Sequence, residues 1–189
     1  MNLIILDLET KKSFQETGGR KPEELEVSVV GTYFYKENLY RIFDEHQLLE
    51  LEQKLSEEIQ VIGFNINRFD LPALQPYFKR LNTSQLETFD LLEDLEKRLG
   101  HRISLQSLCK ATLNEGKSGS GLDAIQYYRA GEMEKLKSYC LDDVRLTKDL
   151  YEFGKRCNLV SYYSKDGSQK LSVKVDWQDP APPPNLSLF

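Results

Sequence analysis

The spacing of apolar residues predicts strands in the first half of the chain and helices in the second. Residues 3–6 are four apolar residues in a row, which is typical of a strand buried on both faces. Residues 27–35 and 39–43 alternate around a short polar turn and predict a β-hairpin. Further strands are predicted at 61–64 and around 88–92.

Apolar residues at helical spacing follow the hairpin, after Asp44 as a plausible N-cap. The predicted helices cover residues 44–59, a segment beginning at 71, and 93–99, 105–112, 122–130 and 132–155. Glycine-rich breaks separate the later helices. The order of elements predicts an α/β fold, in which helices cover the faces of a mixed sheet.

Two parts of the chain do not follow this pattern of buried strands and long helices. The polar segment 11–24 contains two adjacent glycines and a proline, and it predicts a mobile loop. Residues 159–163 and 171–177 flank a Lys-Asp-Gly-Ser turn and predict a terminal hairpin. We therefore expect a main domain at 1–157, a hairpin extension at 158–178 and a proline-rich tail at 179–189.

Composition indicates a soluble globular protein and one main domain, with 189 residues of which 40% are hydrophobic and 29% charged. No apolar run has the ~20 residues that span a bilayer, and no signal peptide is recognisable. Three cysteines without a C-x-x-C pair argue against a disulfide framework, so we expect a cytoplasmic protein. With two histidines, a zinc site of the His/Cys type is improbable.

The net charge of −5 lacks the basic signature of a general nucleic-acid binder. It does not exclude nucleic acid, because acids gathered around a bound metal lower the formal charge without repelling phosphate. Net charge therefore decides nothing about the substrate.

Carboxylates occur at three places from which they can converge. Asp7 and Glu9 are two residues apart at the end of the first strand, so they project to the same side. Asp70 follows a loop, and Tyr139 and Asp143 share one face of the longest helix. Taken singly, each has an ordinary structural explanation as a solvated acid, an N-cap or an amphipathic tyrosine. Held together, the acids would repel one another unless a cation lies between them.

The three motifs together resemble those of the DEDD superfamily of exonucleases. The tyrosine of Tyr-x-x-x-Asp places the resemblance with the DEDDy branch, which comprises DnaQ-like 3′–5′ exonucleases of RNase H-like fold. Gly63-Phe64-Asn65 with Phe69-Asp70-Leu71-Pro72 is similar to the proofreading domains of family B DNA polymerases. The region 105–150 looks like the predicted RNase H-like exonucleases related to them. The histidine variant has no candidate residue at the required interval before Asp143.

The resemblance implies a five-stranded mixed sheet with the second strand antiparallel, and a site for two divalent cations, Mg²⁺ or Mn²⁺. Asp7, Glu9, Asp70 and Asp143 would be the metal ligands, with Asp7 bridging both ions. Tyr139 would orient the attacking water, because its ordinary pKa of ~10 makes it a poor base at neutral pH. The implied activity is 3′–5′ hydrolysis of DNA.

The resemblance also implies substrate contacts. Asn65 would hold the terminal nucleotide or its backbone, and Phe69 would stack or wedge. In the segment after the first strand, the expected substrate-binding residues are Thr10, Lys11, Lys12 and Arg20, whose cations suit backbone phosphates.

The last five residues, Asn-Leu-Ser-Leu-Phe, resemble the pentapeptide by which bacterial replication and repair proteins bind the sliding clamp. Leu186, Leu188 and Phe189 would fill apolar pockets of the clamp, and the proline-rich spacer would limit the ordering cost. Asn185 stands where the usual peptide has glutamine.

Three alternatives stay open at this point. The same site would serve a 3′–5′ exoribonuclease, because contacts that read the 2′-hydroxyl are not visible in the sequence. A non-catalytic, clamp-tethered nucleic-acid-binding domain would keep the fold without turnover. A metal-independent phosphodiesterase is remoter, since no histidine stands near a plausible nucleophile.

Overall fold

A five-stranded mixed sheet forms the centre of the molecule. The computed structural model describes residues 2–57, 60–116 and 119–180. The strands lie in the order β3-β2-β1-β4-β5, with β2 antiparallel to β1 and β3, and β4 parallel to β1 and β5. Their bounds are β1 Leu3–Thr10, β2 Val27–Phe34, β3 Leu39–Asp44, β4 Gln60–Gly63 and β5 Thr88–Asp90. The predicted α/β class and the antiparallel second strand are confirmed.

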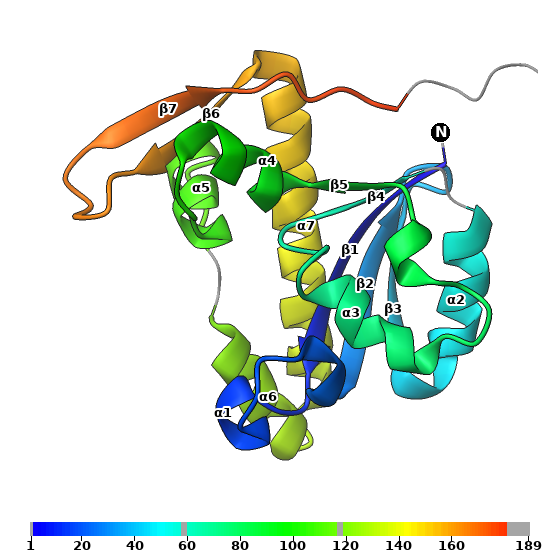
Figure 1. Cartoon of the computed structure of the whole chain (residues 1–189). Coiled ribbons are helices and arrows are strands. Elements are labelled where there is room, and N and C mark those ends of the chain that lie inside the picture. The colour runs from blue at the N-terminus through cyan, green and yellow to red at the C-terminus, as the bar shows by residue number, and fades with distance from the viewer. Residues whose placement is uncertain (1, 58–59, 117–118, 181–189) are drawn as a thin grey trace, which may run out of the picture.

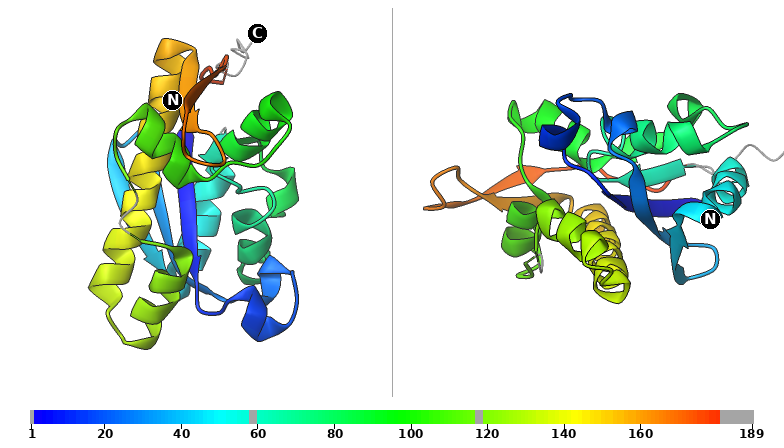
Figure 2. Two further views of the ribbon diagram at one scale, coloured as in Figure 1. Left: turned by 90° about the vertical axis from the view of Figure 1, so that its left-hand side faces the viewer. Right: turned by 90° about the horizontal axis from the view of Figure 1, so that it is seen from below.

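Helices cover both faces of this sheet (Figures 1 and 2). Buried side chains of α2 and α3 pack on one face, and those of α4, α5 and α7 pack on the other. The helices are α1 Phe14–Thr17, α2 Leu48–Glu57, α3 Asp70–Leu74, α4 Leu91–Leu99, α5 Leu105–Thr112, α6 Gly121–Arg129 and α7 Met133–Cys157. The helices predicted from residue 93 onward therefore form within two residues of the predicted bounds.

The alternation of β1 assigns its side chains to these two layers. Leu3 and Ile5 belong to the core beneath α7, whereas Ile4, Leu6 and Leu8 belong to the core beneath α2 and α3. Side chains two residues apart on a strand share a face. Asp7 and Glu9 therefore continue the row of Leu3 and Ile5, toward α7.

The segment 11–24 contains more regular structure than the sequence suggests. The short helix α1 begins after Ser13, whose hydroxyl and backbone N–H both donate to the carboxylate of Glu16. A 3₁₀ turn, Pro22–Glu24, follows. The prediction of a mobile loop is wrong for these two short turns, because a Ser-x-x-Glu capping box stabilises even a single turn. The mobility of the rest of the segment stays a prediction.

A separate two-stranded sheet forms where a terminal hairpin is predicted, from β6 Leu159–Tyr163 and β7 Lys170–Lys174. The chain that leaves β7 is anchored by Trp177, whose indole stacks on Tyr151 at 6.2 Å. Its Nε1 donates to Asp94 at 2.8 Å. Gly154 of α7 provides the space, because a Cβ there would lie 2.2 Å from the indole. This anchor holds the hairpin against the helical layer.

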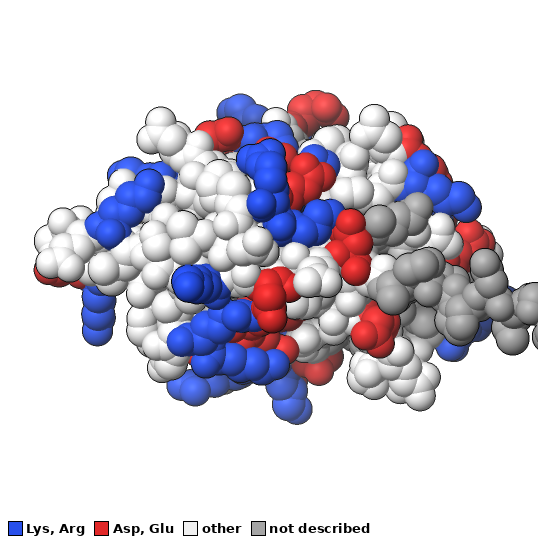
Figure 3. All heavy atoms as spheres, turned by 90° about the horizontal axis from the view of Figure 1, so that it is seen from above, with Lys and Arg blue, Asp and Glu red and all other residues white. Residues whose placement is uncertain are grey.

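The proposed division into main domain, hairpin extension and tail stays a prediction. The clamp-binding residues Leu186, Leu188 and Phe189 lie outside the described residues. Among the described helices, none is long and apolar enough to cross a bilayer. The molecule seen from above carries positive and negative side chains interspersed (Figure 3).

Candidate active site

Three of the carboxylates predicted to converge come from the first strand, β1, and the longest helix, α7. Oxygen atoms of Asp7, Glu9 and Asp143 all lie within 4.8 Å of one another. Asp143 reaches this position because α7 crosses the face of the sheet to which β1 directs Asp7 and Glu9. Glu9 and Asp143 are buried, with 7% and 3% of their surfaces exposed. Sequence positions more than a hundred residues apart thus form one acidic cluster.

A glycine allows α7 to come this close. Gly31 on β2 is the register partner of Asp7, and a Cβ at this position would lie 2.9 Å from both Cys140 Sγ and Val144 Cγ2 of α7. The Cys140 thiol in turn donates to the backbone carbonyl of Asp7 at 3.7 Å. A larger residue at position 31 would push the helix, and with it Asp143, away from the strand.

Asp70 reaches the same pocket from α3. Its Oδ1 accepts a hydrogen bond from the backbone N–H of Leu8 at 3.1 Å, so the carboxylate lies against β1 between Asp7 and Glu9. Asp70 is the first residue of α3, and Phe69 occupies the N-cap position. The N-cap explanation of Asp70 was therefore wrong. All four acids line one pocket of about 390 Å³.

Tyr139 lies one helical turn before Asp143 and is buried. Burial raises the pKa of its hydroxyl well above the usual value, and the negative charges of Asp143, Glu9 and Asp7 raise it further. A hydrogen bond from the hydroxyl to Asp143 acts in the same direction. The tyrosine is therefore a hydrogen-bond donor at neutral pH and holds its proton.

The donor set suits a hard divalent cation. Mg²⁺ and Mn²⁺ prefer oxygen ligands, and all the side chains of the acidic cluster are carboxylates. Burying several like charges so close together is costly unless a counter-charge is present. The acidic cluster is thus a candidate metal site.

The cations predicted to contact substrate are distributed unevenly. Thr10 and Lys12 line the acidic pocket, and the hydroxyl of Thr10 donates to the backbone carbonyl of Lys12 at 2.9 Å. Lys11 points elsewhere, with its ammonium 2.6 Å from Glu45. Neither Lys11 nor Arg20 lines this pocket. Of the three cations, only Lys12 lines the pocket with the acids, and its ammonium forms an ion pair with Glu26.

Apolar side chains flank the acids, and the sequence did not reveal all of them. Asn65 and Phe69 line the pocket as expected. Phe14 of α1 and Leu122 of α6 also line it, although both are exposed, Leu122 by 64%. The rings of Phe14 and Phe69 meet edge to face at 5.9 Å. Exposed apolar groups beside a polar centre would suit the faces of nucleobases.

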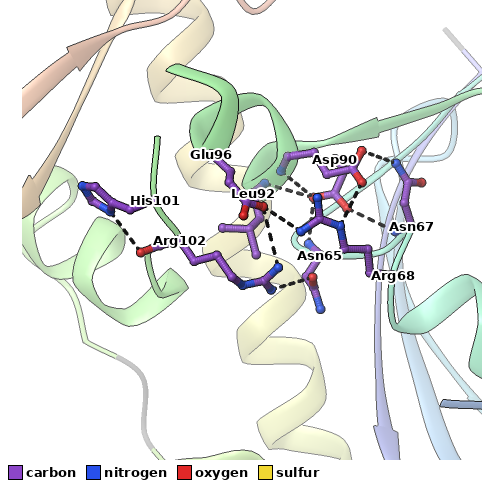
Figure 4. A network of polar contacts seen from close by, with 9 residues as sticks. Asn65, Asn67, Arg68, Asp90, Leu92, Glu96, His101 and Arg102 are labelled. Carbon is purple, nitrogen blue, oxygen red and sulfur yellow. Dashed lines mark hydrogen bonds and ion pairs between the residues drawn. The ribbon is translucent and has the colours of Figure 1, made fainter. Parts of the chain in front are cut away.

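A buried aspartate fixes the loop between β4 and α3 (Figure 4). Asp90 Oδ1 accepts from the backbone N–H of Asn65 at 2.8 Å, and its Oδ2 accepts from that of Asn67 at 3.1 Å. The same Oδ1 caps α4 by accepting from Leu92 at 3.0 Å. Asn65 has a positive φ of 70°, which this bracing helps to hold. Asp90 thus positions the loop that carries Asn65 and leads into α3, where Asp70 is the first residue.

Replacing Asp90 with asparagine is expected to lower the free energy of unfolding by about 1–3 kcal/mol. An amide offers one acceptor where the carboxylate has two, so a buried N–H loses its partner. Urea unfolding followed by circular dichroism measures the effect. Asp142→Asn is the matched control, since Asp142 forms a partly exposed ion pair with Arg145 and is expected to cost about 1 kcal/mol or less. Equal losses in both variants would contradict the bracing role.

Comparison with known proteins agrees with this fold. A family model described as RNase_H superfamily matches residues 14–153, a stretch that includes Asp70, Tyr139 and Asp143 and begins after Asp7 and Glu9. No curated protein matches the chain. The solved structures similar to it include the family B DNA polymerase from the hyperthermophilic archaeon Pyrobaculum calidifontis, with a TM-score of 0.59 and 17% identity. That match covers 80% of this chain but only 24% of the polymerase, and it shows likeness of fold.

Proposed function

Since this chain belongs to the RNase H superfamily, we propose that it is a metal-dependent 3′–5′ exonuclease of the DEDDy type that acts on DNA. The observation that carries the proposal is the meeting of Asp7, Glu9, Asp70 and Asp143 in one pocket, with Tyr139 beside them. Single-stranded or frayed 3′ ends are the proposed substrates. The likeness to a DNA polymerase structure favours DNA over RNA.

The four carboxylates would hold two divalent cations, Mg²⁺ or Mn²⁺. Such cations, when bound, acidify an attacking water and stabilise the charge that develops on the phosphodiester. Asp7 lies centrally, since it belongs to the acidic cluster and also lines the neighbouring hollow. Phe14, Phe69 and Leu122 would hold the terminal base while Lys12 meets a phosphate. Tyr139 would orient the water through its protonated hydroxyl.

The decisive experiment digests end-labelled oligonucleotides with and without Mg²⁺ or Mn²⁺. We expect 5′-labelled single-stranded DNA to shorten stepwise, and 3′-labelled DNA to release a labelled mononucleotide at once. Mismatched duplexes are expected to be shortened faster than paired ones. Cleavage of circular single-stranded DNA, or activity that persists in EDTA, would contradict the proposal. Faster digestion of RNA would assign the same chemistry to an exoribonuclease.

Replacing Tyr139 with phenylalanine is expected to lower kcat by about 10- to 100-fold with little change in KM. The reason is that the substitution removes the one hydroxyl that would orient the water and leaves the ring in place. Because the ordinary pKa of a tyrosine hydroxyl is ~10, its ionisation should not shape the rate between about pH 6 and pH 9. Initial rates on single-stranded DNA from pH 6 to pH 9 test both statements, and a pH profile altered by Tyr139→Phe would argue for a proton-transfer role.

A further inference from the structure

Two hollows continue from the acidic pocket toward the terminal hairpin. The first, of about 380 Å³, shares Asp7, Phe64 and Asn65 with the acidic pocket. The second, of about 620 Å³, shares residues 102–104 with the first and reaches β6 and the β6–β7 turn. We call these two hollows together the trough. It forms a path from the catalytic acids to the hairpin.

The charge of the trough is opposite to that of the whole chain. The chain carries five more acidic than basic residues, 30 against 25. The outer hollow is nevertheless lined by Arg102 and Lys165, and among the residues that the structure describes no aspartate or glutamate lines it. Within the described part of the chain, Asp7 is the only acid that lines the inner hollow. A groove of this sign suits a polyanion.

Arg102 lines both hollows. Its polar contacts are drawn in Figure 4. Its Nη2 donates to Asn65 Oδ1 at 2.8 Å, which ties the trough to the acidic pocket. Glu96 lies 3.7 Å from Nη1 but 2.7 Å from Arg68, so its carboxylate is shared. Half of the Arg102 side chain is exposed. The guanidinium therefore retains donors that can meet a phosphate.

The hairpin forms the outer wall of the trough and is held in place. The backbone N–H of Tyr163 donates to Ser107 Oγ of α5 at 3.2 Å. Thr112 Oγ1 donates to the carbonyl of Ser161 at 2.8 Å and accepts from its N–H at 2.9 Å. Tyr163 also lines the outer hollow, together with Arg102 and Lys165. A docked strand with an aromatic ring resembles the platforms on which unpaired bases stack.

The turn of the hairpin adds a positive charge at the far end. Residues 159–174 contain the lysines Lys165, Lys170 and Lys174 and a single acid, Asp166. The carboxylate of Asp166 accepts hydrogen bonds within the turn, from Ser164 at 2.5 Å and from the Ser168 N–H at 3.1 Å. In Figure 3 the hairpin projects at the left. Of the three lysines, only Lys165 lines the outer hollow.

We propose that the trough holds the 5′ side of a single DNA strand whose 3′-terminal nucleotide occupies the acidic pocket. Arg102 and Lys165 contact backbone phosphates, and Tyr163 stacks on a base. The strand must be unpaired, since stacking on a side chain requires a free base face. This inference rests on the proposed function and adds to it the course of the substrate and a length requirement.

The test uses the full chain and oligothymidylates from the dinucleotide to about 12 nucleotides, with Mn²⁺. We expect kcat/KM to rise with length until the strand reaches the hairpin. Lys165→Ala should lower the ratio of kcat/KM for the longest to the shortest substrate by about tenfold, and Tyr163→Ala by a similar factor. Lys165→Ala should also reduce the slope of log Kd against log salt by about 0.7.

Lys170→Ala is the matched control, because it removes a hairpin charge that does not line the trough. It should leave the length dependence at the wild-type level. A kcat/KM independent of length, or equal effects of Lys165→Ala and Lys170→Ala, would overturn the inference. Arg102→Ala is a less specific test of the trough than Lys165→Ala, since it also removes the hydrogen bond to Asn65.

Failure of the proposed function has a different signature, because the wild-type chain would then degrade neither the dinucleotide nor the longer substrates. Fluorescence anisotropy with a 5′-labelled oligothymidylate would then test whether the trough binds DNA, independently of catalysis. Weaker binding by Lys165→Ala than by Lys170→Ala would support the trough, and equal binding would overturn it.

Discussion

Replacing Asp7 with alanine is expected to lower kcat/KM for metal-dependent cleavage of single-stranded DNA by at least about 10³-fold. Asp7 belongs to the acidic cluster and lines both the acidic pocket and the trough, so no neighbouring side chain can take its place. The fold should persist, because the substitution removes one of several like charges from a crowded position. Initial rates with Mn²⁺ measure the first effect and thermal unfolding the second.

Metal binding gives this prediction a second readout. A ligand that binds the native state raises its stability, so Mn²⁺ should raise the melting temperature of the wild-type chain and raise that of Asp7→Ala much less. Asp142→Ala is the control, since Asp142 is adjacent to Asp143 but pairs with Arg145. Wild-type activity in purified Asp7→Ala would remove the assignment of the metal site.

Replacing Gly63 with alanine is expected to lower the free energy of unfolding by about 1–3 kcal/mol, or more if the strand pair separates. A Cβ at this position would lie 2.0 Å from Ile66 Cγ2 and 2.7 Å from the carbonyl oxygen of Leu6. Neither atom can move freely, because Leu6 is part of β1 and Ile66 is buried. The loop that carries Asn65 would move as a result. Urea unfolding measures the loss.

Gly116 provides the control for this substitution, because a Cβ there would meet no atom of the described residues within 4 Å. Gly116→Ala should change the free energy of unfolding by less than about 0.5 kcal/mol. If Gly63→Ala were as stable as Gly116→Ala, the tight contact between β1 and the β4–α3 loop would not be needed for the fold.

The parts of the fold that depend on local pattern could be predicted from the sequence. The apolar run at 3–6 predicts a strand buried on both faces. The two-residue spacing of Asp7 and Glu9 predicts that their side chains project from the same face of that strand. The four-residue spacing of Tyr139 and Asp143 predicts a common helix face, as observed. These predictions need only the period of a strand and that of a helix.

The features that depend on non-local contacts could not be predicted in this way. The closeness of α7 to β1 depends on Gly31, which has no marked signal in an otherwise ordinary strand. Asp90 falls within the predicted strand around 88–92, and nothing in the local pattern indicates that two of its hydrogen bonds go to residues more than 20 positions away. Lys11 and Lys12 are adjacent in sequence, yet only Lys12 lines the acidic pocket. The local sequence pattern therefore predicts the helices and strands, whereas non-local packing determines which side chains contact one another.

The anchor of the hairpin has a practical consequence. Trp177 is the only tryptophan in the chain, and it is 2% exposed against α7, far along the sequence from the acids of β1. Its intrinsic fluorescence therefore comes from a single place in the molecule, the seam between the hairpin segment and the helical layer. A red shift in emission without loss of circular dichroism would mean that this seam has opened while the sheet remains folded. The protein thus contains its own optical reporter for the outer wall of the trough, and no label is needed.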